Sequence, residues 1–308
     1  MARAGFQPAY LSMSPEELEK RLAGLQEMMR ECRLCPRDCR VDRLAGELGV
    51  CGVGCEPMVS SYGPHFGEEA PLVGRHGSGT IFLTGCNLKC IFCQNYDISH
   101  LRRGEEVTTA SVSRMMLRLQ AQACHNINWV TPTHQAPMLV EALASAMEQG
   151  LSVPVVYNCG GYESLDAIRL LDGIVDIYMP DVKYGDNDAG RQLSGVPDYW
   201  DRNREALAEM HRQVGDLQID ESGIATRGLL VRHLVLPENL ARTEVVMQFL
   251  ASLSKHTYVN VMAQYRPEYR AGEVPDLTRR ITGQEYRAAA QAALDAELTR
   301  LDDRWGAR

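Results

Sequence analysis

The sequence lacks any hydrophobic run as long as the ~18 residues that a membrane-spanning helix needs. The segment from Met1 to Glu17 has no apolar core of the kind found in signal peptides. Low-complexity tracts and fixed-period repeats are also absent, which excludes disordered and solenoid architectures. We therefore expect a globular, cytoplasmic protein without a membrane partner.

Positive charge is scarce too, since 32 Lys and Arg oppose 40 Asp and Glu and give a net charge of -8. Proteins that coat nucleic acid neutralise phosphates with Lys and Arg, so nucleic acid is not an expected partner. Cysteine, in contrast, occurs ten times, and eight of these residues lie between Cys32 and Cys93. In a reducing cytoplasm we expect such cysteines to bind metals or to take part in catalysis.

From residue 80 onward, short β-branched runs alternate with helical stretches. The predicted strands are Thr80 to Thr84, Ile127 to Thr131, Val153 to Tyr157, Val175 to Met179, Leu229 to Leu236 and Thr257 to Met262. The predicted helices are Ala110 to Cys124, Ala136 to Gln149, Glu163 to Leu171, Asp198 to Val214 and Ala241 to Ser254. This α/β alternation predicts a parallel sheet, either open and doubly wound or a partial barrel of six β/α units, with its chemistry at the carboxyl ends of the strands.

Four segments follow from these patterns. We expect an N-terminal helix within residues 1–31, a Cys-rich metal-binding extension over 32–60, the barrel over 61–275 and a C-terminal helix within 276–308. The first helix is amphipathic between Pro15 and Cys32 and begins after a capping Ser14, and the last is predicted from Gly283 to Leu301.

The loop after the first strand carries Cys86, Cys90 and Cys93 in a Cys-x3-Cys-x2-Cys spacing. Iron–sulfur clusters are held by Cys thiolates, and three local thiolates on a four-iron cluster would leave one iron open for a ligand. The alternative is a zinc site completed by a distant His or Cys.

This loop resembles that of the radical S-adenosylmethionine (radical SAM) superfamily, in which an aromatic residue, here Phe92, precedes the last cysteine. The similarity extends over residues 31–270 to PflX-type relatives of pyruvate formate-lyase activating enzyme. It rests on Gly85 to Asn95, Asn126 to His134, Met179 to Tyr184 and Val231 to Pro237.

The resemblance implies a partial, TIM-like (βα)6 barrel with a 4Fe-4S cluster on Cys86, Cys90 and Cys93. In such an oxidoreductase the open iron binds S-adenosylmethionine, and one electron from flavodoxin or ferredoxin cleaves it to a 5′-deoxyadenosyl radical that abstracts hydrogen from a substrate. The substrate could be a glycine of a partner glycyl radical enzyme, or an unidentified small molecule or protein. The alternative from another functional class is a non-catalytic iron–sulfur or zinc protein that acts as a sensor or a scaffold.

Polar residues at the other strand ends are the candidate cofactor contacts. Thr131 and Thr133 stand where many superfamily members have Gly-Gly-Glu, and their oxygens could accept from the cofactor ammonium. Asn158 and Gly160 follow the third strand, where an amide and a close backbone approach suit a ribose or a carboxylate.

The fourth and fifth strands add charged residues. By resemblance to activating enzymes, Asp181 and Lys183 lie beside the cofactor, and Asp181 with the carbonyl of Met179 binds a monovalent cation. Arg232 interrupts an apolar strand and needs an anion, for which the cofactor carboxylate is the candidate.

A second cysteine group precedes the first strand. Cys32, Cys35, Cys39 and Cys51 provide four thiolates, which suffice for either zinc or an iron–sulfur cluster, and Cys55 is a nearby fifth. The spacing does not distinguish zinc from an iron–sulfur cluster. It also does not distinguish a structural site from an electron relay.

Overall fold

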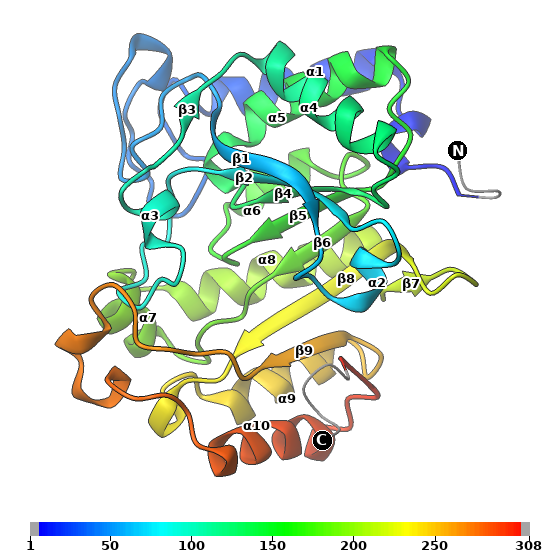
Figure 1. The fold of residues 1–308 in the computed structure, drawn as a ribbon. Coiled ribbons are helices and arrows are strands. Elements are labelled where there is room, and N and C mark those ends of the chain that lie inside the picture. Colours follow the sequence, from blue (N-terminus) through cyan, green and yellow to red (C-terminus); the bar gives the residue numbers. More distant parts are fainter. Residues whose placement is uncertain (1–5, 303–308) are drawn as a thin grey trace.

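The computed structural model describes residues 6–302 and contains one mostly parallel sheet that remains open. Figure 1 shows its strands arranged in a curve. The strands follow the order β10-β9-β8-β6-β5-β4-β2-β1-β3, and β7 pairs with β8. Six of them form the parallel core: β2 (Ser78–Leu83), β4 (Ile127–Val130), β5 (Val155–Cys159), β6 (Ile177–Pro180), β8 (Ala225–Leu234) and β9 (Tyr258–Met262). The predicted partial barrel of six strands is confirmed.

Helices connect these strands, as the alternation predicts. The predicted ones are α4 (Thr109–Ala121) after β2, α5 (Ala136–Glu148) after β4, α6 (Leu165–Leu170) after β5, α8 (Tyr199–Val214) after β6 and α9 (Thr243–Leu253) after β8. Two shorter helices, α3 (Tyr96–Ser99) after β2 and α7 (Asn187–Ser194) after β6, were not predicted. The central strands are buried, since every residue of β5 and β6 is inaccessible to solvent or nearly so. Burial on both faces explains why they read as continuous apolar runs.

At one edge of the sheet, the strands β1 and β3 were not predicted from the sequence. β1 (Met58–His65) runs antiparallel to β2, from Val59 opposite Leu83 to His65 opposite Ser78, and β3 (Glu105–Glu106) pairs with it. Because β1 is antiparallel, the chain leaves it at the amino-terminal end of the parallel strands and enters α2 (Ala70–Val73).

The opposite edge is formed by the C-terminal region. The last predicted helix ends earlier than expected, since α10 covers Gly283–Asp295 and Arg300–Leu301 form β10 beside β9. β7 (Gln218–Ile219) adds a short antiparallel pair to β8.

The N-terminal helix is confirmed as α1 (Pro15–Glu27), and the Ser14 hydroxyl accepts a hydrogen bond from the amide of Glu17 at 3.2 Å. It packs beside α5 and α6. Residues 1–5 and 303–308, which belong to the first and last predicted segments, lie outside the described residues. None of the helices within residues 6–302 is long and apolar enough to cross a membrane.

The Cys-rich segment is almost free of regular structure. Between α1 and β1 the structure has one 3-10 turn, η2 (Arg43–Ala45). The Arg43 side chain is fully buried and donates hydrogen bonds to the carbonyls of Gly54, at 3.1 Å from Nε, and His134, at 2.7 Å from Nη1. Through these hydrogen bonds, the buried Arg43 side chain holds the Cys-rich segment against the barrel. The other 3-10 turns are η1 (Ala9–Ser12), η3 (Thr133–Gln135), η4 (Pro237–Asn239), η5 (Ala271–Glu273) and η6 (Pro275–Leu277).

Candidate active site

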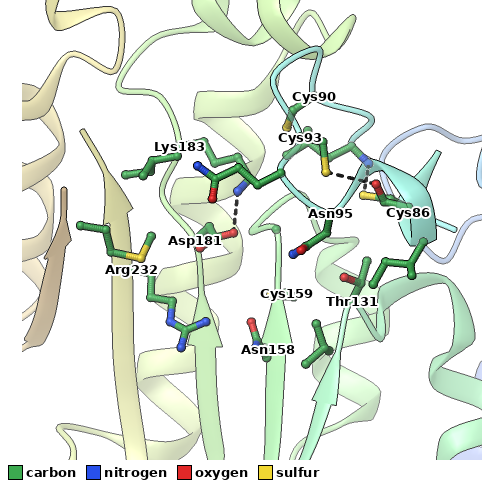
Figure 2. A pocket seen from close by; sticks show the side chains of 18 of the residues that line it. Cys86, Cys90, Cys93, Asn95, Thr131, Asn158, Cys159, Asp181, Lys183 and Arg232 are labelled. Atoms are coloured by element: carbon green, nitrogen blue, oxygen red, sulfur yellow. Dashed lines mark hydrogen bonds and ion pairs between the residues drawn. The ribbon is translucent and has the colours of Figure 1, made fainter. Parts of the chain in front are cut away.

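A cavity of about 420 Å³ lies inside the curve of the sheet, where the central strands end. This volume is within the range of small-molecule and cofactor sites. Most of the predicted site residues line it: Cys86, Cys90, Phe92, Cys93, Thr131, Asn158, Gly160, Asp181, Lys183 and Arg232. Figure 2 shows the three cysteines at one end of the cavity and the Arg232 guanidinium directed away from them.

The cysteine loop follows β2 and places three thiols at the cavity. Polar groups contact each sulfur: the Leu88 amide lies 3.3 Å from Cys86, the Ser194 hydroxyl 3.2 Å from Cys90 and the Ser99 hydroxyl 3.1 Å from Cys93. Tyr184 also hydrogen-bonds to Cys90, and the Asn95 backbone to Cys93. Burial raises the pKa of Cys90, and it raises that of Cys93 to about 11. Such thiols keep their protons near neutral pH, and binding of a metal would displace them.

The donor set fits an iron–sulfur cluster held by three cysteines. Thiol chemistry, burial and a shared cavity are what a cluster requires, since each thiolate binds a different iron. Single metal ions are a different case: among residues 6–302, no three His, Cys, Asp or Glu side chains are grouped to hold one ion.

Arg37, from the Cys-rich segment, holds the cysteine loop in place. Its guanidinium donates four hydrogen bonds of 2.8–2.9 Å, to the carbonyls of Asn87, Leu88, Ser194 and Gly195. Ser194 is also the donor to Cys90. One side chain therefore joins the Cys-rich segment, the cysteine loop and the end of α7.

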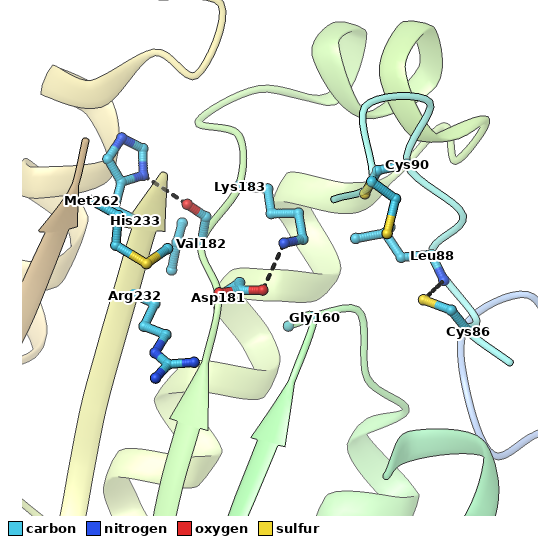
Figure 3. A network of polar contacts seen from close by, with 12 residues as sticks. Cys86, Leu88, Cys90, Gly160, Asp181, Val182, Lys183, Arg232, His233 and Met262 are labelled. Carbon is cyan, nitrogen blue, oxygen red and sulfur yellow. Dashed lines mark hydrogen bonds and ion pairs between the residues drawn. The ribbon is translucent and has the colours of Figure 1, made fainter. Parts of the chain in front are cut away.

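Asp181 and Lys183, after β6, form an ion pair with Nζ and Oδ2 2.6 Å apart (Figure 3). Burial by itself lowers the pKa of Lys183, but the charge of Asp181 and the hydrogen bond to it raise that pKa, so the net direction is upward. Lys183 is therefore a cation at the cavity wall. The hydroxyl of Tyr199 accepts from the Lys183 amide at 2.9 Å and donates to the Gly160 carbonyl at 3.1 Å, which ties the ends of β5 and β6 together.

Arg232 lines the cavity, and the anions that pair with it are two carboxylates of this chain. Nε and Nη2 donate to Glu69 at 2.8 and 2.6 Å, and Nη2 also contacts Glu68. Burial opposes ionisation of Glu68, but the charge of Arg232 and the contact with His65 outweigh it and lower its pKa to about 2. Sequence reasoning missed both glutamates, because the only available signal was two adjacent acids before Pro71 in a segment without a predicted strand.

The two threonines after β4 point in different directions. Thr131 has a φ of 62° and lines the cavity, whereas Thr133 is buried and its hydroxyl donates to Glu163 at 2.8 Å. Glu163 was not predicted; burial raises its pKa to about 7, although hydrogen bonds from Thr133 and Tyr157 lower it. Met179 is fully buried within β6 and is not among the residues that line the cavity.

The four N-terminal cysteines gather next to the cysteine loop. Burial raises the pKa of Cys35, and the charges of Cys51, Cys32 and Cys39 raise it further, so these three thiols lie near Cys35. Within the described residues, however, they are not grouped closely enough to hold one metal ion. Cys55 is exposed. Gly85 has a φ of 76°, and a Cβ there would lie 2.8 Å from the Cys51 carbonyl oxygen, so the two cysteine segments are in direct contact.

Comparison with known proteins agrees with this arrangement. The sequence model of the Radical SAM superfamily matches residues 80–250, which include the cysteine loop and the strands β2 to β8. A protein of Methanocaldococcus jannaschii, "Uncharacterized protein MJ0674", is 32% identical over 94% of this chain and 82% of its own length.

Two further matches are weaker. The pyruvate formate-lyase-activating enzyme of Clostridium pasteurianum is 26% identical over 42% of this chain and 56% of its own. Streptococcus suis SuiB, solved with its precursor peptide SuiA, superposes with a TM-score of 0.46 and 13% identity over 71% of this chain and 46% of SuiB.

Proposed function

Because this chain belongs to the Radical SAM superfamily, we propose that Cys86, Cys90 and Cys93 hold its 4Fe-4S cluster and that S-adenosylmethionine binds beside them in the cavity. The observation that carries this proposal is that three cysteines and the Asp181–Lys183 pair meet in one cavity at the ends of the strands. When bound and reduced by one electron from an external donor, the cluster and S-adenosylmethionine would supply the radical chemistry that removes a hydrogen atom from a substrate.

The protein's own residues bind and orient the cofactor. Lys183 offers a partly buried positive charge to its carboxylate, and the Thr131 oxygens accept from its ammonium. Asn158 and the backbone at Gly160 are within the same cavity and suit the ribose. We also propose the Met179 carbonyl with Asp181 for a monovalent cation. We propose Phe92 as a further cofactor contact, since it lines the cavity, and its packing against Tyr184 and Tyr265 supports the cysteine loop.

For the substrate we propose hydrogen abstraction from a glycine of a partner glycyl radical enzyme, with flavodoxin or ferredoxin as the cytoplasmic electron donor. The local similarity to the pyruvate formate-lyase-activating enzyme supports this choice. The alternative is an unidentified small molecule or protein. A non-catalytic sensor or scaffold has no use for a partly buried Asp181–Lys183 pair at the cavity.

For Cys32, Cys35, Cys39 and Cys51 we propose a second metal, zinc or an iron–sulfur cluster. The proximity of Cys35 to the other three thiols supports it, although within the part of the chain that the structure describes no three of the four are grouped to hold a single ion. Arg43 supports it too, as a buried cation close enough to Cys51 to lower the pKa of that thiol against the effect of burial. A positive charge there offsets the negative charge of a metal bound by four thiolates. Contact between Gly85 and Cys51 makes this site a neighbour of the cluster loop, which favours an electron relay if the metal is iron.

The central test is anaerobic reconstitution with iron and sulfide, reduction with dithionite and an assay for 5′-deoxyadenosine. We expect the wild-type protein to form it and Cys86→Ala, Cys90→Ala and Cys93→Ala to form none. Cys124→Ala is the matched control, since Cys124 is buried elsewhere and should tolerate the change. Formation of 5′-deoxyadenosine by any of the three loop variants would refute the assignment.

A further inference from the structure

The end of the cavity opposite the cysteines is closed by two adjacent carboxylates. Glu68 and Glu69 follow β1, which ends at the amino-terminal side of the parallel strands, and they turn inward between β4 and β9. Both line the cavity although they are only 5% and 1% exposed. We call Glu68, Glu69, Arg232 and Asn260 the acidic floor.

The acidic floor has more negative than positive charge. Glu69 accepts two hydrogen bonds from Arg232 and one, at 2.6 Å, from the Asn260 amide nitrogen. Glu68 shares the same guanidinium and accepts from Asn128 at 3.2 Å. Two buried carboxylates thus face one guanidinium, and an uncompensated buried charge is costly.

The nearest additional cation is His65, whose Nδ1 lies 3.4 Å from Glu68. It neutralises the floor only when protonated. With a neutral imidazole, the floor carries one net negative charge.

The acidic floor also contains a hydrogen-bond acceptor that receives no hydrogen bond within the described residues. The hydrogen bond to Glu69 fixes the Asn260 amide with its nitrogen toward that carboxylate, so its oxygen is the free end. Asn260 is 6% exposed and lines the cavity, yet within the described part of the chain no group donates to its Oδ1. A buried acceptor without a donor calls for one from a ligand.

We propose that the acidic floor binds a cationic group of the substrate, an ammonium or a guanidinium, with Glu68 and Glu69 supplying the charge and Asn260 an acceptor. This inference rests on the proposed function, because it names the substrate class of the same cavity.

The floor is separate from the cofactor-binding end. In Figure 2 the Arg232 guanidinium and the three cysteines lie on opposite sides of Asp181 and Lys183, and Figure 3 shows the same for Cys86 and Cys90. A substrate anchored at the floor would reach toward the cysteines from the far side of the cavity.

Equilibrium dialysis of the reconstituted holoenzyme tests the proposal without turnover. The probes are radiolabelled n-butylammonium and n-butyrate, in mildly alkaline buffer that favours neutral His65, with S-adenosylmethionine at saturation. We expect n-butylammonium to be retained and n-butyrate not. Glu69→Gln, which keeps the side-chain shape but removes one charge, should weaken n-butylammonium binding about tenfold, as expected for loss of one charged contact.

Glu106→Gln is the matched control, since Glu106 is exposed on β3, and it should bind both probes as the wild type does. Equal retention of the two probes, a preference for n-butyrate, loss of n-butylammonium when S-adenosylmethionine is added, or unchanged binding by Glu69→Gln would each overturn the proposal. The comparison of probes on the wild type remains decisive even if the variant does not fold.

The two proposals can fail independently. If 5′-deoxyadenosine forms but n-butylammonium does not bind, only the acidic floor is wrong. If n-butylammonium binds and no 5′-deoxyadenosine forms, the proposed function is wrong and the cation site stands.

Discussion

The Arg37 guanidinium donates a 2.9 Å hydrogen bond to the carbonyl of Leu88, and thereby couples the N-terminal Cys-rich segment to the loop that carries Cys86 and Cys90. The same side chain makes three further bonds to carbonyls. The geometry of the cysteine loop thus depends on a residue about fifty positions earlier in the chain. Whatever holds the Cys-rich segment together also supports the candidate cluster site.

Replacing Arg37 with Ala should loosen the cysteine loop. Since bonds from a charged donor contribute more than neutral ones, iron release to a chelator should be on the order of tenfold faster in Arg37→Ala. Release is followed by absorbance of the iron–chelator complex under anaerobic conditions. Arg33→Ala is the control, because Arg33 is exposed, and an equal rate in the two variants would contradict the role of Arg37.

Lys183→Met should weaken binding of S-adenosylmethionine by about tenfold to a hundredfold, because it removes a charged contact and leaves Asp181 without its partner. The visible absorbance of the cluster should persist, since Lys183 is not a cluster ligand. Binding is measured by equilibrium dialysis. Lys255→Met, which breaks an exposed ion pair with Glu297, should bind as the wild type does. Wild-type affinity in Lys183→Met would remove Lys183 from the cofactor site.

Glu163 should make the protein less stable as pH rises. Its pKa is about 7 in the folded protein against a reference of 4.5, so between these values the unfolded carboxyl releases its proton while the folded one retains it. The free energy of unfolding therefore falls with rising pH in that window. In Glu163→Gln the decrease between about pH 5 and about pH 8 should shrink by roughly 2 to 3 kcal/mol.

Urea unfolding at the two pH values measures this change. Some decrease should remain in Glu163→Gln, because burial also raises the pKa of Asp176 to about 7. Glu148→Gln, at the exposed end of α5, should retain the full wild-type decrease. A decrease of wild-type size in Glu163→Gln would show that Glu163 does not titrate in this window.

Cys39→Ser should destabilise residues 32–55, because this segment has little regular structure and metal binding would have to supply part of its folding free energy. Metal content and trypsin sensitivity are compared in a protein that already carries Cys86→Ala, Cys90→Ala and Cys93→Ala. One zinc would make the site structural, whereas iron with a visible band would indicate a second cluster. Cys55→Ser is the control, since Cys55 is exposed. Metal loss in the control alone would show that the ligand set is wrong.

Local patterns in the sequence determined the main elements. Apolar runs and helical periodicity predicted six parallel strands and their crossover helices, because burial on both faces of a strand leaves a pattern within a few residues. Ser14 and Pro15 marked the start of α1 for the same reason, since a helix cap acts on the next turn. The spacing of Cys86, Cys90 and Cys93 lies within one loop, so it too was visible in the sequence.

Tertiary structure decided the contacts between distant residues. Glu69 and Arg232 are 163 positions apart, and no local pattern shows which anion a buried arginine meets. β1, the strand that precedes Glu69, is half-exposed and lies near the edge of the sheet. It therefore lacks the continuous run of apolar residues that marks the central strands. Thr131 and Thr133 look equivalent in sequence, yet a left-handed backbone at Thr131 separates them, one lining the cavity and one bonded to Glu163. The sequence alone thus determined which residue types meet at the strand ends, and packing of remote segments determined their partners and charge balance.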